Sequence, residues 1–172
     1  MLTVSYDSYA FQLKRLTHIL TNYHAQTWRN FDEIDHVYAT LTQTINLWRT
    51  QSKVKRCIEI HYDKDLELPL VWFNFYSIDG KRLSIDEITE IGVIPSALIP
   101  HLKEPVNFEV ISKNNPEKNE QYYCFVPTKT CENQEGKEFS LVNWLYFFSQ
   151  FVGINIDVEM VTEFVDSWYD GI

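Results

Sequence analysis

Positive charge, cysteine and long apolar runs are all scarce in this sequence, and each shortage excludes a class of function. Lysine and arginine together number 15, against 24 aspartates and glutamates, so the formal net charge is −9. The only basic cluster is "KVKR" at 53–56. A face that binds nucleic acid needs clustered positive charge to neutralise phosphates. We therefore expect no nucleic-acid partner and favour recognition of other proteins.

The cysteines, histidines and apolar residues are distributed in ways that exclude further classes. Three cysteines, an odd number, fit a reduced cytoplasmic protein better than a disulfide framework. The five histidines show no metal-ligand spacing with the cysteines, so no metal and no other cofactor is expected. The longest apolar stretch, "LVNWLYFFSQFV", is shorter than the roughly 18 residues of a spanning helix, and the start shows no secretory leader. We expect a cytoplasmic protein without a transmembrane segment.

Aromatic side chains, in contrast, are abundant: 11 Phe, 10 Tyr and 5 Trp in 172 residues. Together with an apolar fraction of 45%, they indicate a folded protein rather than a disordered one. The length suits one core, and we take residues 1–172 as a single domain.

Periodicity predicts the order of helices and strands. Apolar residues recur at three- and four-residue steps over 6–27, which indicates an amphipathic helix. Alternation over 57–63 and a fully apolar run over 68–77 indicate a hairpin whose second strand lies in the middle of a sheet. Further strands are expected at 35–48 (one or two strands), 106–111 and 121–126, and further helices at 84–92, up to Gly153 and at 157–171.

These elements predict an α+β fold with an antiparallel sheet of about four strands and helices packed against it. Ser84 and Glu87 have the spacing of a capping box at the start of a helix. The strand 121–126 is expected to end at Pro127, because proline cannot donate to a central ladder. Within that strand Cys124 is expected to be buried, and Cys57 is expected to be structural.

A longer stretch has a more specific pattern than these elements alone. In "RCIEIHYDKDLELPLVWFNFYSIDGKRLSIDEI", a hairpin with proline near the start of its second strand leads to an Asp-Gly turn and a capped helix. Together with "YYCFVPTKT" and "NWLYFFSQFVGIN", over roughly residues 57–156, it resembles the autophagy E2-like conjugating enzymes, most closely the family of autophagy-related protein ten. The related family of autophagy-related protein three shares the hairpin but typically carries a long flexible insertion, for which this chain has no room.

The resemblance implies an E2-like fold, an activity and a set of partners. The activity would be that of a transferase that takes the ubiquitin-like autophagy protein twelve from its E1-like enzyme, autophagy protein seven. The transferase would hold this modifier as a cysteine thioester and pass it to autophagy protein five. Such a step belongs to a ubiquitin-like conjugation pathway of autophagy, a process of protein transport that begins in the cytoplasm.

The catalytic signature of the family is His-Pro-Cys-x-Thr directly after an aromatic strand. The five residues here are Val126, Pro127, Thr128, Lys129 and Thr130, so that proline and the last threonine match. Thr128 stands at the family's cysteine position. The nucleophile in thiol exchange is a thiolate, whereas a threonine hydroxyl would need a base that Val126 does not supply. Cys131 follows in the same polar segment, within about 10 Å of Thr128 between Cα atoms, and is the candidate thioester cysteine.

Three interpretations stay open at this point. The first is a conjugating enzyme that acts through Cys131. The second is a descendant of such an enzyme that has lost catalysis, as Thr128 suggests, and serves as a non-covalent binding or scaffold module in autophagy. The third is an unrelated α+β domain. For Cys131 itself, a reactive cysteine displaced from the position of Thr128 and an incidental surface thiol both stay open.

Overall fold

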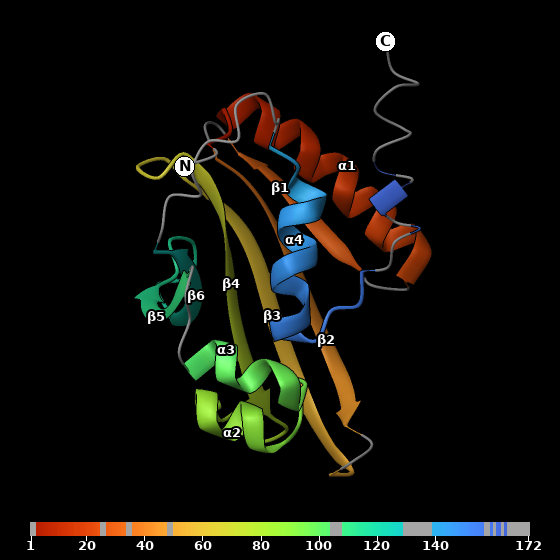
Figure 1. Ribbon diagram of the computed structural model, residues 1–172, viewed down its shortest axis with the longest axis vertical. Helices are drawn as coiled ribbons and strands as arrows, with labels where there is room; N and C mark the ends of the chain where they lie inside the picture. The colour runs from red at the N-terminus through yellow and green to blue at the C-terminus, as the bar shows by residue number, and fades with distance from the viewer. Residues whose placement is uncertain are drawn as a thin grey trace.

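The computed structural model describes residues 3–24, 27–33, 36–47, 50–103, 108–128, 139–156, 159, 161, 162 and 164. Its helices are α1 (Tyr6–His24), α2 (Ile85–Glu90), α3 (Ile99–Lys103) and α4 (Leu141–Ser149), with short 3-10 helices η1 (Ser96–Leu98) and η2 (Gln150–Val152). Its strands are β1 (Trp28–Glu33), β2 (His36–Leu47), β3 (Ser52–Asp63), β4 (Leu68–Ser77), β5 (Phe108–Asn114) and β6 (Gln121–Pro127). Helices α1 and α4 cover one face of the sheet that these strands form (Figure 1).

The sheet has six strands in the order β1-β2-β3-β4-β6-β5. Every neighbouring pair in it is antiparallel. The predicted α+β class with an antiparallel sheet is therefore confirmed, but the expected number of about four strands is wrong. Strand β1 was not predicted because only Trp28 is buried in it, and an edge strand of polar residues gives no apolar alternation.

Helix α1 has the apolar seam that the sequence predicts, and the seam faces the sheet. Burying a leucine fully contributes about 1.5–3 kcal/mol, so the seam fixes α1 against β1 and β2. The helix ends at His24 rather than at 27, because Trp28 already pairs with Leu41 in the β1–β2 ladder. The seam residues with 0% exposure are Tyr9, Leu13, Leu16 and Leu20.

Strands β3 and β4 form the predicted hairpin, with Asp63 opposite Leu68 beside the turn. Strand β4 coincides with the predicted 68–77 and is buried from Leu68 to Phe75, on both faces. It pairs with β3 on one side and with β6 on the other, which confirms its central position and places β6 in the same sheet. The strands expected at 35–48, 106–111 and 121–126 correspond to β2, β5 and β6.

Local sequence signals set the ends of the later helices. The predicted capping box is present, since Glu87 N donates to Ser84 Oγ and Ser84 N donates to Glu87 Oε2. The backbone enters the left-handed region after α2 at Gly92 (φ 78°) and after η2 at Gly153 (φ 66°), which glycine adopts without strain. The helix expected at 157–171 falls mostly outside the described residues.

One of the three basic residues of the cluster at 53–56, Arg56, is buried rather than exposed. Arg56 is 3% exposed and donates to the carbonyl oxygens of Val152 and Gly153, at the end of η2, and to Gln43 Oε1 at 2.7 Å. A cation at a helix C-terminus compensates the partial negative charge of the free carbonyls. Burial lowers the pKa of Arg56 to about 10, which leaves the side chain charged at neutral pH. Arg56 thus joins β3 to the end of α4 and η2.

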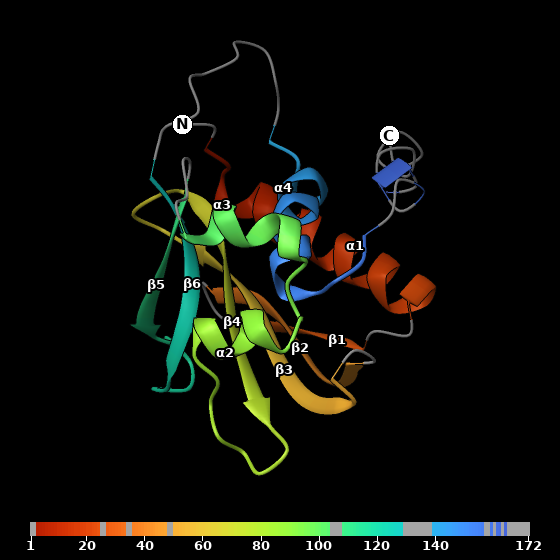
Figure 2. The ribbon, with the colours of Figure 1, turned by 60° about the horizontal axis from the view of Figure 1, so that its bottom comes forward.

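The β5–β6 hairpin lies beside β4 (Figure 2). Strand β6 pairs with β4 only at Trp72 opposite Cys124 and Phe73 opposite Tyr123, whereas β2 and β3 pair along almost their whole length. Along its other edge β6 pairs with β5 from Gln121 to Pro127. The turn between β5 and β6 is joined to β3 by the polar contacts described below.

Candidate functional site

Strand β6 leads out of the sheet to Thr128, one of the two predicted site residues. The strand ends at Pro127, as predicted, and Thr128 follows as an exposed residue outside any helix or strand. Residues 129–138, which include the candidate Cys131, lie outside the described residues. Of the two predicted site residues, the structure therefore locates Thr128 and does not test Cys131.

The other two cysteines are buried in the sheet and are poorly suited to nucleophilic attack. Cys124 is 0% and Cys57 is 6% exposed, and both are free thiols. Burial raises the pKa of the Cys124 thiol to about 12, so the reactive thiolate is scarce at neutral pH. The Thr42 hydroxyl donates to Cys57 Sγ at 3.8 Å. The predicted burial of Cys124 is confirmed, and Cys57 is buried as well.

The next described residue after Thr128 is Phe139. At this point the side chain of Gln12 joins the chain to α1 through hydrogen bonds. The Gln12 side chain is buried, with Oε1 accepting from Leu141 N at 2.8 Å and Nε2 donating to Phe139 O at 3.2 Å and to Ser8 Oγ at 3.1 Å. The first turn of α4 is thereby joined to α1. The residues that flank 129–138 are both anchored, Pro127 in the β5–β6 ladder and Phe139 by Gln12.

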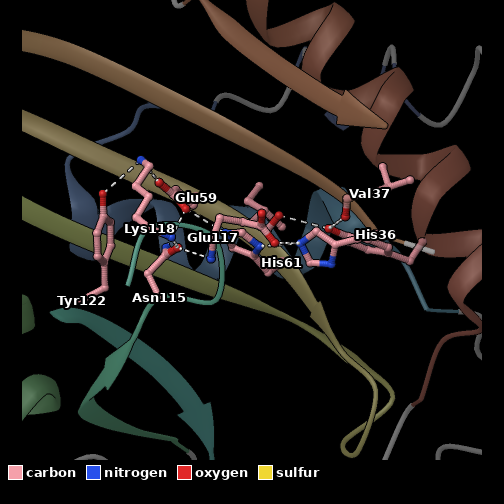
Figure 3. A network of polar contacts seen from close by, with 10 residues as sticks. His36, Val37, Glu59, His61, Asn115, Glu117, Lys118 and Tyr122 are labelled. Carbon is pink, nitrogen blue, oxygen red and sulfur yellow. Dashed lines mark hydrogen bonds and ion pairs between the residues drawn. The ribbon is translucent and has the colours of Figure 1, made fainter. Parts of the chain in front are cut away.

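A second concentration of polar side chains lies on the face of the sheet opposite α1 and α4, with Glu59 at its centre (Figure 3). Glu59 is 1% exposed. Its carboxylate accepts from His61 Nε2 at 2.8 Å, from Asn115 Nδ2 at 2.7 Å and from Lys118 Nζ. Burial alone would raise the pKa of Glu59, but these three donors together lower it to about 2. Glu59 is therefore a buried, permanently ionised carboxylate at neutral pH.

The contacts extend from Glu59 through two histidines to the exposed edge of the group. His61 Nδ1 lies 3.2 Å from His36 Nε2, and His36 Nε2 lies 3.1 Å from Glu117 Oε1. Lys118 Nζ also donates to Tyr122 Oη at 3.3 Å. His36 keeps part of its side chain in contact with solvent, whereas His61 is 2% exposed. We call the group the Glu59 network; its members are Glu59, His61, His36, Asn115, Glu117 and Lys118.

Aromatic rings enclose the inner end of the Glu59 network. The His61 ring is stacked on Tyr38 at 4.8 Å between centroids and is contacted edge-on by Trp72 at 6.0 Å. Tyr38 is in turn stacked on Phe31 at 4.7 Å. The rings fix the plane of the His61 imidazole, so its two nitrogens point along the chain of polar contacts.

Sequence analysis did not single out the Glu59 network. Alternation in β3 does separate Glu59 and His61 from the apolar residues Ile58 and Ile60, and that pattern is typical of a solvent-exposed polar face. The structure buries this part of the face because the turn between β5 and β6 covers it. The one signal in the sequence that could have indicated the Glu59 network is a glutamate and a histidine two residues apart, on the same face of a strand.

A cavity of about 310 Å³ lies apart from both of these sites, between residues 91–97 and Leu47 at the end of β2. Apart from the Ser96 hydroxyl, its described lining residues carry no polar or titratable side chain. The cavity therefore suits an apolar group.

The described part of the chain contains no group of three or more histidine, cysteine, aspartate or glutamate side chains that could hold a metal ion. No described helix is long and apolar enough to cross a membrane. No model of a known protein family and no curated protein matches the sequence.

Proposed function

We propose that the protein is an E2-like carrier of the autophagy conjugation pathway that holds a ubiquitin-like modifier as a thioester on Cys131. The observation that carries the proposal is the exit of β6: a central hairpin and a capped helix precede it, the strand ends at Pro127, and exposed Thr128 opens the segment that contains Cys131. This order is the one on which the resemblance to the autophagy E2-like enzymes rests.

The chemistry selects Cys131 among the candidate nucleophiles. The Cys131 thiolate attacks the carbonyl carbon of the thioester on the E1, the bond to the E1 sulfur breaks, and that sulfur leaves as a thiolate. A lysine amine of the acceptor then attacks the new thioester, forms an amide, loses a proton and releases the Cys131 thiolate. Cys57 and Cys124 are buried, and the Thr128 hydroxyl has no thiol chemistry to offer.

The proposed partners are those of the resembled family. They are the E1-like autophagy protein seven as donor, the ubiquitin-like autophagy protein twelve as cargo and autophagy protein five as acceptor, all met in the cytoplasm. The net charge of −9 agrees with recognition of basic protein surfaces.

A non-covalent binding module is the alternative, and one observation favours it. Thr128 and Val126 stand where the family has its cysteine and histidine, so the residues at the exit of β6 lack the usual nucleophile. Such a module would bind the modifier or its acceptor without forming a thioester.

Incubation with the E1, ATP and modifier, followed by gels with and without reducing agent, tests the proposal. We expect a reducible adduct in the wild type and in the matched control Thr128→Ala, and none in Cys131→Ser. A reducible adduct that survives in Cys131→Ser contradicts the assignment of the nucleophile. Absence of any adduct with tight modifier binding favours the binding module, and absence of both adduct and binding contradicts membership of this pathway.

A further inference from the structure

Strand β5 forms one edge of the sheet, and the described part of the chain adds no strand beyond it (Figure 2). Its ladder with β6 determines which of its backbone groups face outward. Asn115 N donates to Glu120 O just past the last paired residues. In an antiparallel ladder every second residue directs its N–H and C=O at the partner strand. Counting back from Asn115, the N–H and C=O groups of Val110 and Ser112 therefore point away from β6.

The residues that alternate with these carry a charge pattern on the face of the sheet opposite α1 and α4. Glu109 and Lys113 lie on this face, on either side of Ile111, and both are exposed. Their cross-strand neighbours on β6, Val126 and Tyr122, carry no charge at neutral pH. Four residues of extended strand separate Glu109 from Lys113 by about 13 Å, too far for an ion pair. Within the described residues of one copy, neither charge has an ion-pair partner.

A second copy of the same strand supplies a partner for each charge. When two β5 strands run antiparallel with their Ile111 residues opposite each other, Glu109 of each copy lies directly opposite Lys113 of the other. Val110 then lies opposite Ser112 of the other copy, and such pairs exchange two backbone hydrogen bonds through their outward-facing groups. The charged residues fall at the non-hydrogen-bonded positions, where opposing Cα atoms are about 4.5 Å apart. Opposite charges at these positions stabilise a ladder, and like charges destabilise it.

The composition of β5 also favours pairing with a further strand. Val110 and Ile111, at the centre of β5, are β-branched and only partly buried. No proline interrupts the strand, and its one acidic and one basic residue cancel. Edge strands are usually protected from pairing by proline, by charge or by a covering helix. In β5 the two charges do not protect against a second β5, because the antiparallel register turns them into attracting pairs.

The other edge strand, β1, is less suited to such pairing. Arg29 and Glu33 have the same spacing in it, but helix α1 lies over this edge, where Asn30 Nδ2 donates to Thr17 Oγ1 at 2.6 Å. Two copies joined through β1 would place their β1 strands about 4.8 Å apart and crowd the α1 helices above them, whose axes need about 8–10 Å. Strand β1 also contains Asn30 and Asp32, residue types that are depleted in strands.

From the outward-facing backbone groups and the two opposed charges, we propose that the outer edge of β5 is an interface between two copies of this chain, joined by an antiparallel β5–β5 ladder centred on Ile111. The two six-stranded sheets then form one continuous sheet. A single pair of strands buries a small area, so the association is weak and depends on concentration. The inference does not depend on the proposed conjugation activity.

Sedimentation velocity at protein concentrations up to about 0.3 mM tests this interface. We expect the wild type to form dimers whose fraction rises with concentration. Glu109→Lys and Lys113→Glu each place like charges opposite each other at both symmetric positions, and each should raise the dissociation constant at least about tenfold. The double variant Glu109→Lys/Lys113→Glu restores opposite charges with their positions exchanged, and its dissociation constant should return to within about threefold of the wild type.

Two control variants make the same changes of charge away from β5. Glu33→Lys on β1 matches Glu109→Lys, Lys55→Glu on β3 matches Lys113→Glu, and both alter exposed residues and should leave the dimer intact. Unfolding midpoints verify that all variants fold, as expected for substitutions at exposed positions. A wild type that stays monomeric, a double variant that dimerises no better than the single ones, or a dimer lost in Glu33→Lys would overturn the inference.

Disulfide cross-linking tests the register of the ladder directly. In a Cys131→Ser background, the variants Glu109→Cys and Lys113→Cys are oxidised separately and as an equal mixture. Opposing Cα atoms about 4.5 Å apart are within the range of a disulfide, whereas two copies of one variant hold their substituted positions about 13 Å apart. The mixture should therefore form a linked dimer that neither variant forms alone. Equal cross-linking of the mixture and of the separate variants would contradict the antiparallel register.

Discussion

Gln12→Leu removes the contacts that join α1 to the start of α4 while preserving the approximate volume of the side chain. Gln12 is 2% exposed, so water does not replace the lost partners. The Leu141 N–H, in the first turn of α4, loses its acceptor, and the Phe139 carbonyl and the Ser8 hydroxyl lose a donor. These groups lie at the interface between the two helices.

The expected cost is dominated by the orphaned N–H group. A buried donor without a partner costs about 1–3 kcal/mol, and each additional lost hydrogen bond costs about 0.5–1.5 kcal/mol. Because Phe139 and Ser8 are only partly buried, water recovers part of their share. Gln12→Leu should therefore lower the free energy of unfolding by about 2–4 kcal/mol.

Urea unfolding measures this loss directly. With a slope of about 2 kcal/mol per molar urea, the midpoint should fall by about 1–2 M. The matched control is Gln150→Leu at an exposed position, which should change stability by less than about 0.5 kcal/mol. A midpoint shift in Gln12→Leu no larger than that of the control would refute the role assigned to Gln12.

Three further outcomes are expected. Alkylation of the native protein at neutral pH should leave Cys57 and Cys124 unmodified in a peptide map, and labelling of Cys124 at the rate of a free thiol would contradict its burial. Ser84→Ala should cost about 1 kcal/mol in urea unfolding by removing one half of the capping box of α2, and no measurable cost would contradict that contact. The pKa of Glu59 is lowered from 4.5 to about 2, so its ionisation stabilises the fold above about pH 4.5, and this contribution is lost as the pH falls toward 2. Glu59→Gln should therefore flatten the dependence of the free energy of unfolding on pH in that range. An unchanged pH dependence would contradict the lowered pKa of Glu59.

Much of the sheet could be predicted from the sequence because its central strands have strong local signals. The apolar run 68–77 has few alternatives to a buried strand, and Pro127 ends β6 through the chemistry of its own ring. Strand β1 could not be predicted in the same way, since five of its six residues are not buried and it is held by pairing with β2.

The Glu59 network could not be predicted because its members come together only in the folded chain. Lys118 and Asn115 reach Glu59 across sequence separations of 59 and 56 residues. Nothing local to Glu59 indicates that a turn far along the chain will cover it. The position of Thr128 at the end of β6 could be predicted, because the apolar pattern of the strand and the proline that ends it are local signals. The choice of nucleophile in the candidate reactive segment rests instead on the chemistry of thiols and hydroxyls.

The most direct test of the central claim is the identity of the residue that carries the modifier after loading with the E1 and ATP. Proteolysis without reducing agent and mass spectrometry of the fragments would identify that residue. The account predicts that the C-terminal glycine of the modifier is joined to the sulfur of Cys131. A modifier joined to Cys57, to Cys124 or to the Thr128 hydroxyl, or a chain that stays unmodified while the E1 is fully charged, would contradict it.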